Sequence, residues 1–540
     1  MKKKLLFLLA WFPIMLIGQN AVDKTIMVIA DPHVMAESLS DNGIAFDDMI
    51  AKQRKMLDMS EMAFKALVDT ALFYHPSLVL IPGDLTKDGE LASHDVVLSQ
   101  LERLQEVGIK TLLIPGNHDI GGTAYSYFGE EKTSVETLAD TDWESTYAMV
   151  YDQAIAKDPH SHSYVAEPLL GVTVIGIDAS HNDGEGALSD STLAWVLQQA
   201  DDATQKDNMI IAMCHWQLLE HVDEGGILME SGLLQNADVV RDSLMKHGVH
   251  LVLTGHMHVN SISTYRDTTN ISSDSIVEVS TGSPITYPCP YRWLTLSNKN
   301  STVEIETMYL TSLPGYEELI SYSREWMREH TMNIIPSLSV KMFDKVSITL
   351  ENELTEMTQG MPMGGMIVSM MKNMLPKTDE EKIAIVNKYF ANTLIELYLL
   401  HSLANEPEYI EADSLAQNIY DGIDVMLHEM TDAVLKNYQS IQAQLISAVK
   451  ESNQVSIQSL VEDRTNWASA NYSDQTNDLY VKLRINKEQE QQPTNVENTT
   501  IQNVEDTAIY DILGRRIADT QCLRSGMIYI QNGKKFVVNK

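Results

Sequence analysis

Two histidines stand two residues apart in the stretch LVLTGHMHV, directly after a short apolar run. A His-x-His pair on its own is more often structural than chemical, so its meaning depends on partners elsewhere in the chain. Four other apolar runs also end in carboxylate, carboxamide or imidazole side chains. The five clusters together contain Asp31, His33, Asp84, Asn117, His118, Asp119, His215, His256 and His258. Five clusters of this kind in one chain indicate a common site.

These residue types are typical of a site for divalent metal ions. Carboxylate, carboxamide and imidazole ligands together suit borderline metals such as Zn, Mn or Fe. The candidates are too many for one catalytic ion, but they match two ions that share a carboxylate. Two such cations can clamp a phosphate and lower the pKa of a bridging water to near neutrality. The sequence therefore predicts two divalent metal ions, with Mn, Zn and Fe all left open.

The spacing within the clusters also predicts local geometry. In the segments 31–33 and 256–258, side chains two residues apart would face the same side if the backbone were extended. Gly83, Gly116 and Gly255 stand directly before ligand residues and are expected to allow a tight backbone there. The three cysteines of the chain are too few and too dispersed for a thiolate metal site, and they allow at most one disulfide.

The five apolar runs read as strands of an α/β domain. From residue 24 to about residue 309, short runs rich in Val, Ile and Leu alternate with stretches of helical periodicity. Runs without polar alternation are typical of strands buried on both faces. In open α/β sheets, the carboxyl ends of the strands converge on the ligand crevice. A layered domain of this kind would bring all nine side chains to one edge.

Composition divides the rest of the chain. Amphipathic helical patterns dominate after Pro314, a polar stretch follows, and the last residues become apolar again with glycine turns. The predicted divisions are a signal peptide over 1–20, an α/β domain over 24–310, a mostly helical domain over 311–485, a polar linker over 486–505 and a small β-module over 506–540.

Charge and the N-terminal segment bear on partners and location. A formal net charge of -36 repels nucleic-acid polymers and anionic membranes, so cations fixed in a site must attract any phosphate-bearing substrate. Lys2–Lys4 precede the apolar stretch Leu5–Ile17, which is short for a membrane span, and small or polar residues follow. This pattern predicts a signal peptide and no transmembrane segment after its cleavage, with an uncleaved anchor helix as the alternative.

The ordered series D-x-H, GD, GNHD, H and GH-x-H resembles the calcineurin-like metallophosphoesterase family over residues 24 to about 300. The resemblance implies a layered sandwich of β-sheets flanked by helices, with two metal sites. The first site would consist of Asp31, His33, Asp84 and His258. The second would consist of Asp84, Asn117, His215 and His256, so that Asp84 bridges the two.

The same resemblance implies the chemistry. A metal-bound hydroxide would attack phosphorus in line. His118 would protonate the leaving oxygen or stabilise the transition state, and Asp119 would orient the imidazole of His118. The stretches GDLTKDGE and GNHD are more similar to bacterial phosphodiesterase-like members, including those that act on cyclic nucleotides, than to protein serine/threonine phosphatases. Lys87 stands where purple acid phosphatases carry a metal-binding tyrosine. The predicted function is an exported phosphodiesterase acting on a small molecule such as a nucleotide. Two alternatives are a phosphomonoesterase and a non-catalytic surface binding protein.

The C-terminal stretches AIYDILGRRIA and GMIYIQNGKKFVVNK resemble the sorting domains read by the type IX secretion machinery. The resemblance implies a protein that is secreted or displayed at the cell surface, with that machinery as a partner. Two alternatives remain at this point. The module could merely stabilise or space the enzyme, and the protein could be periplasmic.

Overall fold

The computed structural model describes residues 24–180, 186–221, 232–267, 274–297, 302–330, 335–402, 409–453, 472–474, 480–484, 509–511, 516–517, 528–531 and 534–537. The predicted signal peptide over 1–20 and the predicted linker over 486–505 lie outside these residues. Within the described ranges, no helix is long and apolar enough to cross a membrane.

Two β-sheets form the centre of the first domain. The six-stranded sheet has the order β16 (Tyr480–Arg484), β14 (Thr302–Tyr309), β13 (Pro290–Ser297), β1 (Lys24–Val28), β2 (Leu78–Pro82) and β3 (Lys110–Ile114). The eight-stranded sheet has the order β15 (Tyr472–Asp474), β11 (Ser261–Arg266), β12 (Ser275–Ser280), β10 (Leu251–Thr254), β9 (Met209–Cys214), β8 (Val172–Ile177), β7 (Tyr164–Leu169) and β6 (Ala154–Lys157). Strands β1, β2 and β3 are parallel, as are β8, β9, β10 and β12.

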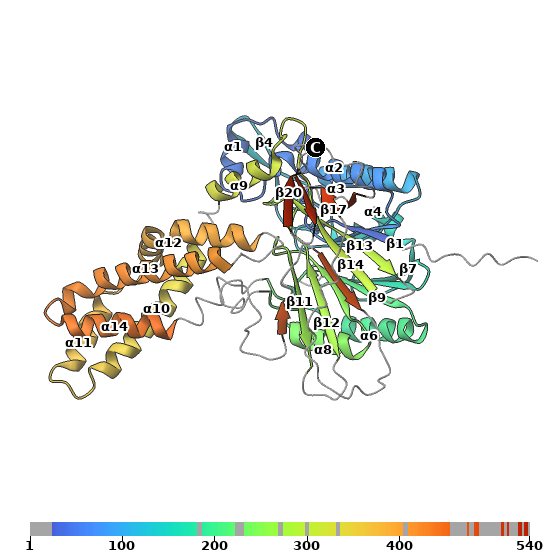
Figure 1. The fold of residues 1–540 in the computed structure, drawn as a ribbon. Coiled ribbons are helices and arrows are strands. Elements are labelled where there is room, and N and C mark those ends of the chain that lie inside the picture. The colour runs from blue at the N-terminus through green and yellow to red at the C-terminus, as the bar shows by residue number, and fades with distance from the viewer. Residues whose placement is uncertain are drawn as a thin grey trace, which may run out of the picture.

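Helices cover the outer faces of both sheets (Figure 1). Helices α2 (Ser60–Tyr74) and α3 (Leu91–Glu106) lie on the six-stranded sheet, and α6 (Asp190–Gln205) and α8 (Ala237–Lys246) lie on the eight-stranded sheet. Between the sheets, Leu80, Met213 and Leu253 belong to one buried cluster. The predicted layered sandwich is confirmed, with one difference. The ligand-bearing strands belong to two facing sheets instead of one sheet edge.

The burial of the strands explains why their sequences do not alternate. Every residue of β2 and of β8 is buried, because each strand packs against the other sheet on one face and against helices on the other. Helix α6 shows the complementary pattern, with Leu193, Val196, Ala200 and Ala203 buried along one face. The Ser189 side chain caps α6 by accepting a hydrogen bond from the backbone of Thr192.

Short elements connect the strands of the first half of the domain. They are η1 (Glu37–Leu39), α1 (Ile44–Ile50), η2 (Leu57–Met59), β4 (Ala124–Phe128), β5 (Glu131–Val135), η3 (Asp140–Asp142), α4 (Trp143–Thr146) and α5 (Ala148–Tyr151). Strands β4 and β5 pair with each other as a separate hairpin. The loop between α1 and η2 lies beside the site described below.

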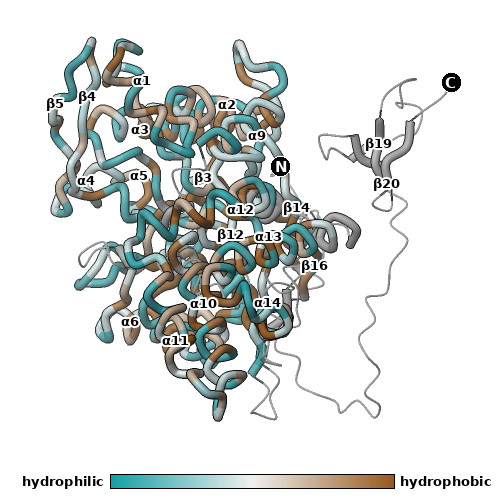
Figure 2. Tube along the Cα trace, turned by 90° about the vertical axis from the view of Figure 1, so that its left-hand side faces the viewer, coloured by the Kyte–Doolittle hydropathy of each residue, from teal (hydrophilic) through white to brown (hydrophobic). Residues whose placement is uncertain are grey.

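A helical domain follows the sandwich. Its helices are α9 (Leu319–His330), α10 (Ile335–Met357), α11 (Gly364–Met374), α12 (Asp379–His401), α13 (Tyr409–Leu435) and α14 (Gln439–Ser452). Helices α10 to α14 project from one side of the sandwich, whereas α9 lies against it (Figure 1). Hydropathy varies along α10 and α14 (Figure 2), as expected for helices with one buried face. Their shared core includes Phe343, Leu350, Phe390, Ile419 and Leu445.

The chain returns from the helical domain to the sandwich. Strand β15 pairs antiparallel with β11, and β16 pairs antiparallel with β14, so each sheet gains an edge strand. The side chain of Val481 enters the core between the sheets. The sequence analysis assigned residues 472–484 to the helical domain, and the pairing corrects that assignment. Strands of three and five residues at an edge are too short for their patterns to reveal a partner so distant in the chain.

The last strands form a separate antiparallel sheet in the order β18 (Arg516–Ile517), β17 (Ile509–Asp511), β19 (Ile528–Gln531) and β20 (Lys534–Val537). Strands β17, β19 and β20 lie in the apolar runs from which a β-module was predicted.

Candidate metal centre

The five predicted clusters meet at the carboxyl ends of strands from both sheets. Loops after β1, β2 and β3 bring three clusters from the six-stranded sheet, and loops after β9 and β10 bring two from the eight-stranded sheet. Two groups of possible metal ligands result. The first is Asp31, His33, Asp84 and His258, and the second is Asp84, His215 and His256. Within each group, the ligand atoms lie within 4.8 Å of one another.

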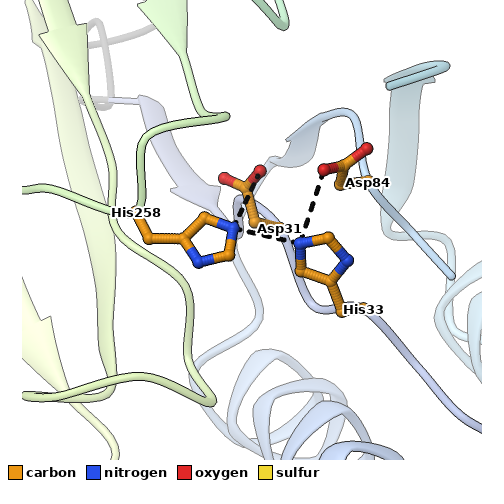
Figure 3. A group of neighbouring side chains, drawn as sticks. All are labelled: Asp31, His33, Asp84 and His258. Atoms are coloured by element: carbon orange, nitrogen blue, oxygen red, sulfur yellow. Dashed lines mark hydrogen bonds and ion pairs between the residues drawn. The ribbon is translucent and has the colours of Figure 1, made fainter. Parts of the chain in front are cut away.

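The first group is fully buried and its ligand atoms point toward one another (Figure 3). His33 Nε2 lies 3.4 Å from Asp84 Oδ2 and 3.0 Å from His258 Nε2. His258 Nε2 lies 3.7 Å from Asp31 Oδ1. Two imidazole nitrogens at this separation must share either a proton or a cation. The oxygens beside them favour a cation.

The second group extends from the same aspartate. His215 Nε2 lies 3.4 Å from Asp84 Oδ2 and 3.0 Å from Asn117 Oδ1. His256 Nδ1 lies 3.0 Å from the same Asn117 oxygen. Asp84 Oδ2 is therefore 3.4 Å from one nitrogen of each group. A single carboxylate oxygen between two sets of donors is the arrangement that a bridging ligand requires.

Most of the ligand residues have an unusual backbone conformation. Positive φ angles occur at Asp31 (50°), His33 (41°), Asp84 (50°), His256 (66°) and His258 (59°). The expectation of extended segments over 31–33 and 256–258 is therefore wrong. Each strand ends in a sharp turn, and the turn, not strand alternation, aims the side chains. Left-handed conformations at non-glycine residues carry strain, and such strain clusters at functional sites.

Three glycines are required by space at the centre. Gly83 has a φ of 96°, and a Cβ there would lie 2.6 Å from Nδ1 of His215. A Cβ at Gly116 would collide with Oδ1 and the backbone nitrogen of Asp84, and a Cβ at Gly255 would collide with Oδ2 of Asp31. The tight backbone that was predicted at Gly83, Gly116 and Gly255 is present at all three positions.

Hydrogen bonds orient the ligands from behind. His215 Nδ1 lies 3.0 Å from Pro82 O, so this nitrogen donates to the carbonyl and leaves Nε2 free to bind a metal. The backbone nitrogen of His118 donates to Asp84 Oδ1 at 2.9 Å. The backbone nitrogen of His256 donates to Asp31 Oδ1 at 2.9 Å. Both carboxylates are thus fixed through one oxygen.

Burial and neighbouring charges shift the pKa values of the ligand residues in different directions. Burial raises the pKa of Asp31 to about 8, and the charge of Asp84 adds to the increase. Burial acts in the same direction on Asp84, but His215, His118 and His33 hold the pKa of Asp84 well below its usual range. For His215, burial would lower the pKa, yet Asp84 raises it to about 9. The raised pKa values of Asp31 and His215 mean that these groups bind protons, and bound metal cations could replace those protons.

A test of fit comes from the second oxygen of Asp31. Among the described residues, Oδ2 of Asp31 is buried without a hydrogen-bond partner. Buried polar atoms nearly always have a partner, so this one calls for a ligand that protein atoms do not supply. The donor set of carboxylate, carboxamide and imidazole fits two divalent ions of the Zn, Mn or Fe type. The residues present therefore suit the predicted pair of metals.

His118 lies at the rim of the first group, with its ring centroid 4.8 Å from that of His33. Its Nδ1 lies 2.7 Å from Lys87 O and 3.1 Å from Asp88 Oδ1. About a third of its side chain is exposed. A substrate can therefore reach this imidazole.

The prediction that Asp119 orients His118 is corrected by these contacts. The two oxygens of Asp119 instead accept hydrogen bonds from Thr86 N, Thr86 Oγ1 and Gly116 N. Asp119 thus holds the loop together, and Asp88 takes the orienting position. Asp88 stands in the GDLTKDG stretch, four residues after Asp84, but only the turn geometry reveals that it faces His118.

Three further histidines have structural roles. His94 contacts Tyr147 OH at 2.6 Å and Asp119 O at 2.9 Å, His162 contacts Asp140, and His221 contacts Glu278. The sequence pattern connects none of them with the metal ligands, and the same holds for His181, which lies outside the described residues. Cys214 and Cys289 are buried free thiols.

One cation beside the centre escaped the sequence analysis. Lys55 Nζ lies 3.4 Å from His33 Nδ1. Burial lowers the pKa of Lys55 to about 8, although the charge of Asp84 acts in the opposite direction. The only signal in the sequence is the stretch KQRK within an acidic chain, and no spacing rule connects it to the ligands.

Known proteins resemble this chain in the same region. Residues 24–260 match the family model described as Calcineurin-like phosphoesterase. Over 201 residues, the chain is 27% identical to a "Probable cyclic nucleotide phosphodiesterase" of Moraxella catarrhalis (strain BBH18). That alignment covers 37% of this chain and 64% of the relative, so the chain spans less than two thirds of the relative's length.

Two solved structures are also similar. A dimetal phosphatase from Danio rerio is 14% identical with a TM-score of 0.37, and the match covers 53% of this chain and 95% of that one. A purple acid phosphatase from yellow lupin (Lupinus luteus) is 13% identical with a TM-score of 0.37, covering 54% of this chain and 52% of that one.

The sandwich and its site agree with the family match. The match to the Calcineurin-like phosphoesterase family model spans residues 24–260, the part of the chain that carries both groups of possible metal ligands.

Proposed function

We propose that this protein hydrolyses a phosphoester with two divalent metal ions. The observation that carries the proposal is the position of Asp84 Oδ2, which lies 3.4 Å from His33 Nε2 on one side and 3.4 Å from His215 Nε2 on the other. Every position that the family motif requires is filled by a suitable donor. A non-catalytic binding protein on the same scaffold would be free to lose one of them.

Each residue has a definite part in the proposed reaction. Asp31, His33, Asp84 and His258 would hold one ion, and Asp84, Asn117, His215 and His256 would hold the other. When bound, two such ions supply a water activated at neutral pH and stabilise the charge on the phosphoryl oxygens. Nδ1 of His118 is held by Lys87 O and Asp88, so its Nε2 is the nitrogen left to deliver a proton to the leaving oxygen.

A small phosphodiester such as a nucleotide is the proposed substrate. The relative from Moraxella catarrhalis, described as a probable cyclic nucleotide phosphodiesterase, supports this choice. The net charge of -36 argues against long nucleic acids. A phosphomonoester is the alternative, since the metal ligands are the same for both.

The test is a substrate panel with defined metals. The chelated protein should be inactive, and adding Mn, Zn, Fe, Ni or Co should restore hydrolysis of an activated aryl phosphodiester. A monoester panel run in parallel separates the two substrate classes. No turnover with any metal on either class would refute the enzymatic proposal.

Substitutions at the centre test the ligand assignment. Asp84→Asn should lose more activity than His215→Ala, because both ions share Asp84 and only one contacts His215. Metal analysis of the purified variants checks the cause. Two bound ions per chain in both variants would contradict the assigned ligands. The exposed His75 provides a matched control, and His75→Ala should keep wild-type activity and metal content.

We further propose that the protein is exported and reaches the outside of the cell. The basic and apolar N-terminal pattern and the resemblance of the C-terminal stretches to type IX sorting domains support this proposal. A chain that ends at residue 494 should keep its hydrolytic activity but remain in the periplasm. Unchanged export of that shortened chain would remove the sorting role.

A further inference from the structure

Two adjacent cations lie beside the first ligand group without belonging to it. Lys55 Nζ is 3.4 Å from Nδ1 of His33, the nitrogen that faces away from the other ligands. Burial lowers the pKa of His258 well below its usual range, and the positive charges of Arg54 and Lys55 lower it further. In a chain with a net charge of -36, two cations at the phosphate-handling centre require an explanation.

The loop that carries these cations is connected by hydrogen bonds to the loop that carries Asp31. The Met56 backbone nitrogen donates to Ile285 O at 2.9 Å, and the Met56 side chain is fully buried. Two residues before Ile285, the hydroxyl of Ser283 donates to Asp31 O at 2.6 Å. Lys55 therefore extends from a backbone whose position relative to Asp31 is set by hydrogen bonds and packing. Such a side chain is placed before any ligand arrives.

The negatively charged side chains around Lys55 interact with other groups. No carboxylate in the described part of the chain lies within ion-pair distance of Lys55 Nζ, and its contact there is an imidazole nitrogen. Asp84 would be shared by two divalent ions. Asp88 forms an ion pair with Lys87 and contacts Nδ1 of His118. Lys87, in contrast, has its own partners in Asp88 and Glu90.

Metal binding would make this imbalance larger. Two divalent cations bring four positive charges, whereas Asp31 and Asp84 supply two negative ones. When Nε2 of His33 binds a metal, its Nδ1 carries the ring proton and can no longer accept a hydrogen bond from an ammonium. A partly buried ammonium in such surroundings is unfavourable unless an anion joins it. The flexible stem of lysine can turn the ammonium toward that anion.

We propose that Lys55, supported by the charge of Arg54, binds a phosphoryl oxygen of the substrate and of the phosphate product. The proposal rests on the proposed function. It adds a protein side chain, Lys55, that recognises the negative charge of the phosphoryl group. The oxygen concerned is one that the two metal ions leave free. Inorganic phosphate and phosphomonoesters offer one more anionic oxygen than a diester does.

The experiment measures phosphate binding by calorimetry on Mn-loaded protein. Lys55→Met should raise the Kd for inorganic phosphate about ten- to a hundredfold, as expected for the loss of one charge-assisted hydrogen bond. Lys55→Gln should show the same loss, and Lys55→Arg should retain most of the affinity. Lys52 is exposed in the same loop, so Lys52→Met is the matched control and should bind phosphate like the wild type.

Metal content is measured on every variant. Wild-type affinity for phosphate in Lys55→Met would overturn the proposal, as would loss of Mn from that variant, because Lys55 would then act by holding His33. A failure of the proposed function would be recognised by a different result, namely the absence of ester hydrolysis by the wild type. Phosphate binding can be measured whether or not turnover occurs.

Discussion

At the scale of single residues, two aspartates near His118 have different tasks. Asp88 touches the imidazole, whereas Asp119 accepts three hydrogen bonds from the loop around Thr86 and Gly116. The proposed function makes His118 the proton donor, so a carboxylate that touches its imidazole would affect the reaction. One that satisfies backbone nitrogens in the interior affects the fold.

Asp88→Asn should therefore lower kcat about ten- to a hundredfold, because the imidazole loses the carboxylate that aligns it. Its metal content should equal that of the wild type. Asp119→Asn should mainly lower the thermal unfolding midpoint, since an amide replaces an acceptor of three hydrogen bonds. Steady-state kinetics and calorimetry of both variants separate the two roles. Wild-type kcat in Asp88→Asn would show that Asp88 has no orienting role.

Space at Gly255 gives a second prediction at this scale. Gly255→Ala places a methyl group against Oδ2 of Asp31, so the carboxylate must move. Affinity for Mn should fall about ten- to a hundredfold, as for other losses of ligand orientation. Titration calorimetry on chelated protein measures this. Gly365→Ala is the control, because a Cβ there meets open space. Equal Mn affinity in both variants would contradict the steric argument.

At the scale of elements, helix α3 is tied to the loop after β3. His94 in α3 reaches Asp119 O at 2.9 Å and Tyr147 OH at 2.6 Å, and it is fully buried. Burial lowers the pKa of His94 to about 4, although the hydrogen bond to Asp119 O acts in the opposite direction. The folded protein therefore keeps this imidazole neutral where the unfolded chain would protonate it.

The consequence is a loss of stability in mild acid. The folded pKa lies below the unfolded value near 6.5, so the contribution is complete above pH 6.5 and is lost as the pH falls toward 4. Between pH 6.5 and pH 5, His94 should account for about 2 kcal/mol of that loss. His94→Gln should show a smaller drop in thermal midpoint over this interval than the wild type. A drop as large as that of His75→Gln, the exposed control, would refute the assignment.

The elements also show what the sequence could reveal. The buried strands β1, β2, β3, β8, β9 and β10 are visible as unbroken apolar runs, because both of their faces are covered. The edge strands β15 and β16 were missed, since a few residues pairing across more than 150 positions leave no local pattern. The residue types of the ligands were predictable. The left-handed turns that orient the ligand side chains were not predictable, because Asp and His seldom adopt a positive φ, whereas glycine does so readily.

At the scale of the whole molecule, the sandwich is completed by strands that lie after the helical domain. Strand β16 runs beside β14 over five paired positions, from Thr302 with Arg484 to Glu306 with Tyr480. The helical domain is thus inserted in the chain between β14 and β15, which both belong to the sandwich. Ser402, the residue directly after α12, lies against the loop that carries His258, since Ser402 O accepts a hydrogen bond from the Asn260 side chain at 3.3 Å.

Truncation tests this completion. A chain that ends at residue 494 keeps β15 and β16 and should unfold at the wild-type temperature. A chain that ends at residue 470 lacks both edge strands and uncovers Val303 and Ile305, so its midpoint should fall by several degrees. Differential scanning calorimetry compares the two. Equal midpoints would mean that the edge strands add nothing to the sandwich.

The central claim is a pair of metal ions that share Asp84. Anomalous diffraction from Mn-loaded crystals tests it most directly, because it locates the ions without reference to activity. We expect two Mn peaks on either side of Asp84 Oδ2. One should contact Asp31, His33 and His258, and the other should contact Asn117, His215 and His256. A single peak, or peaks away from Asp84, would contradict the account.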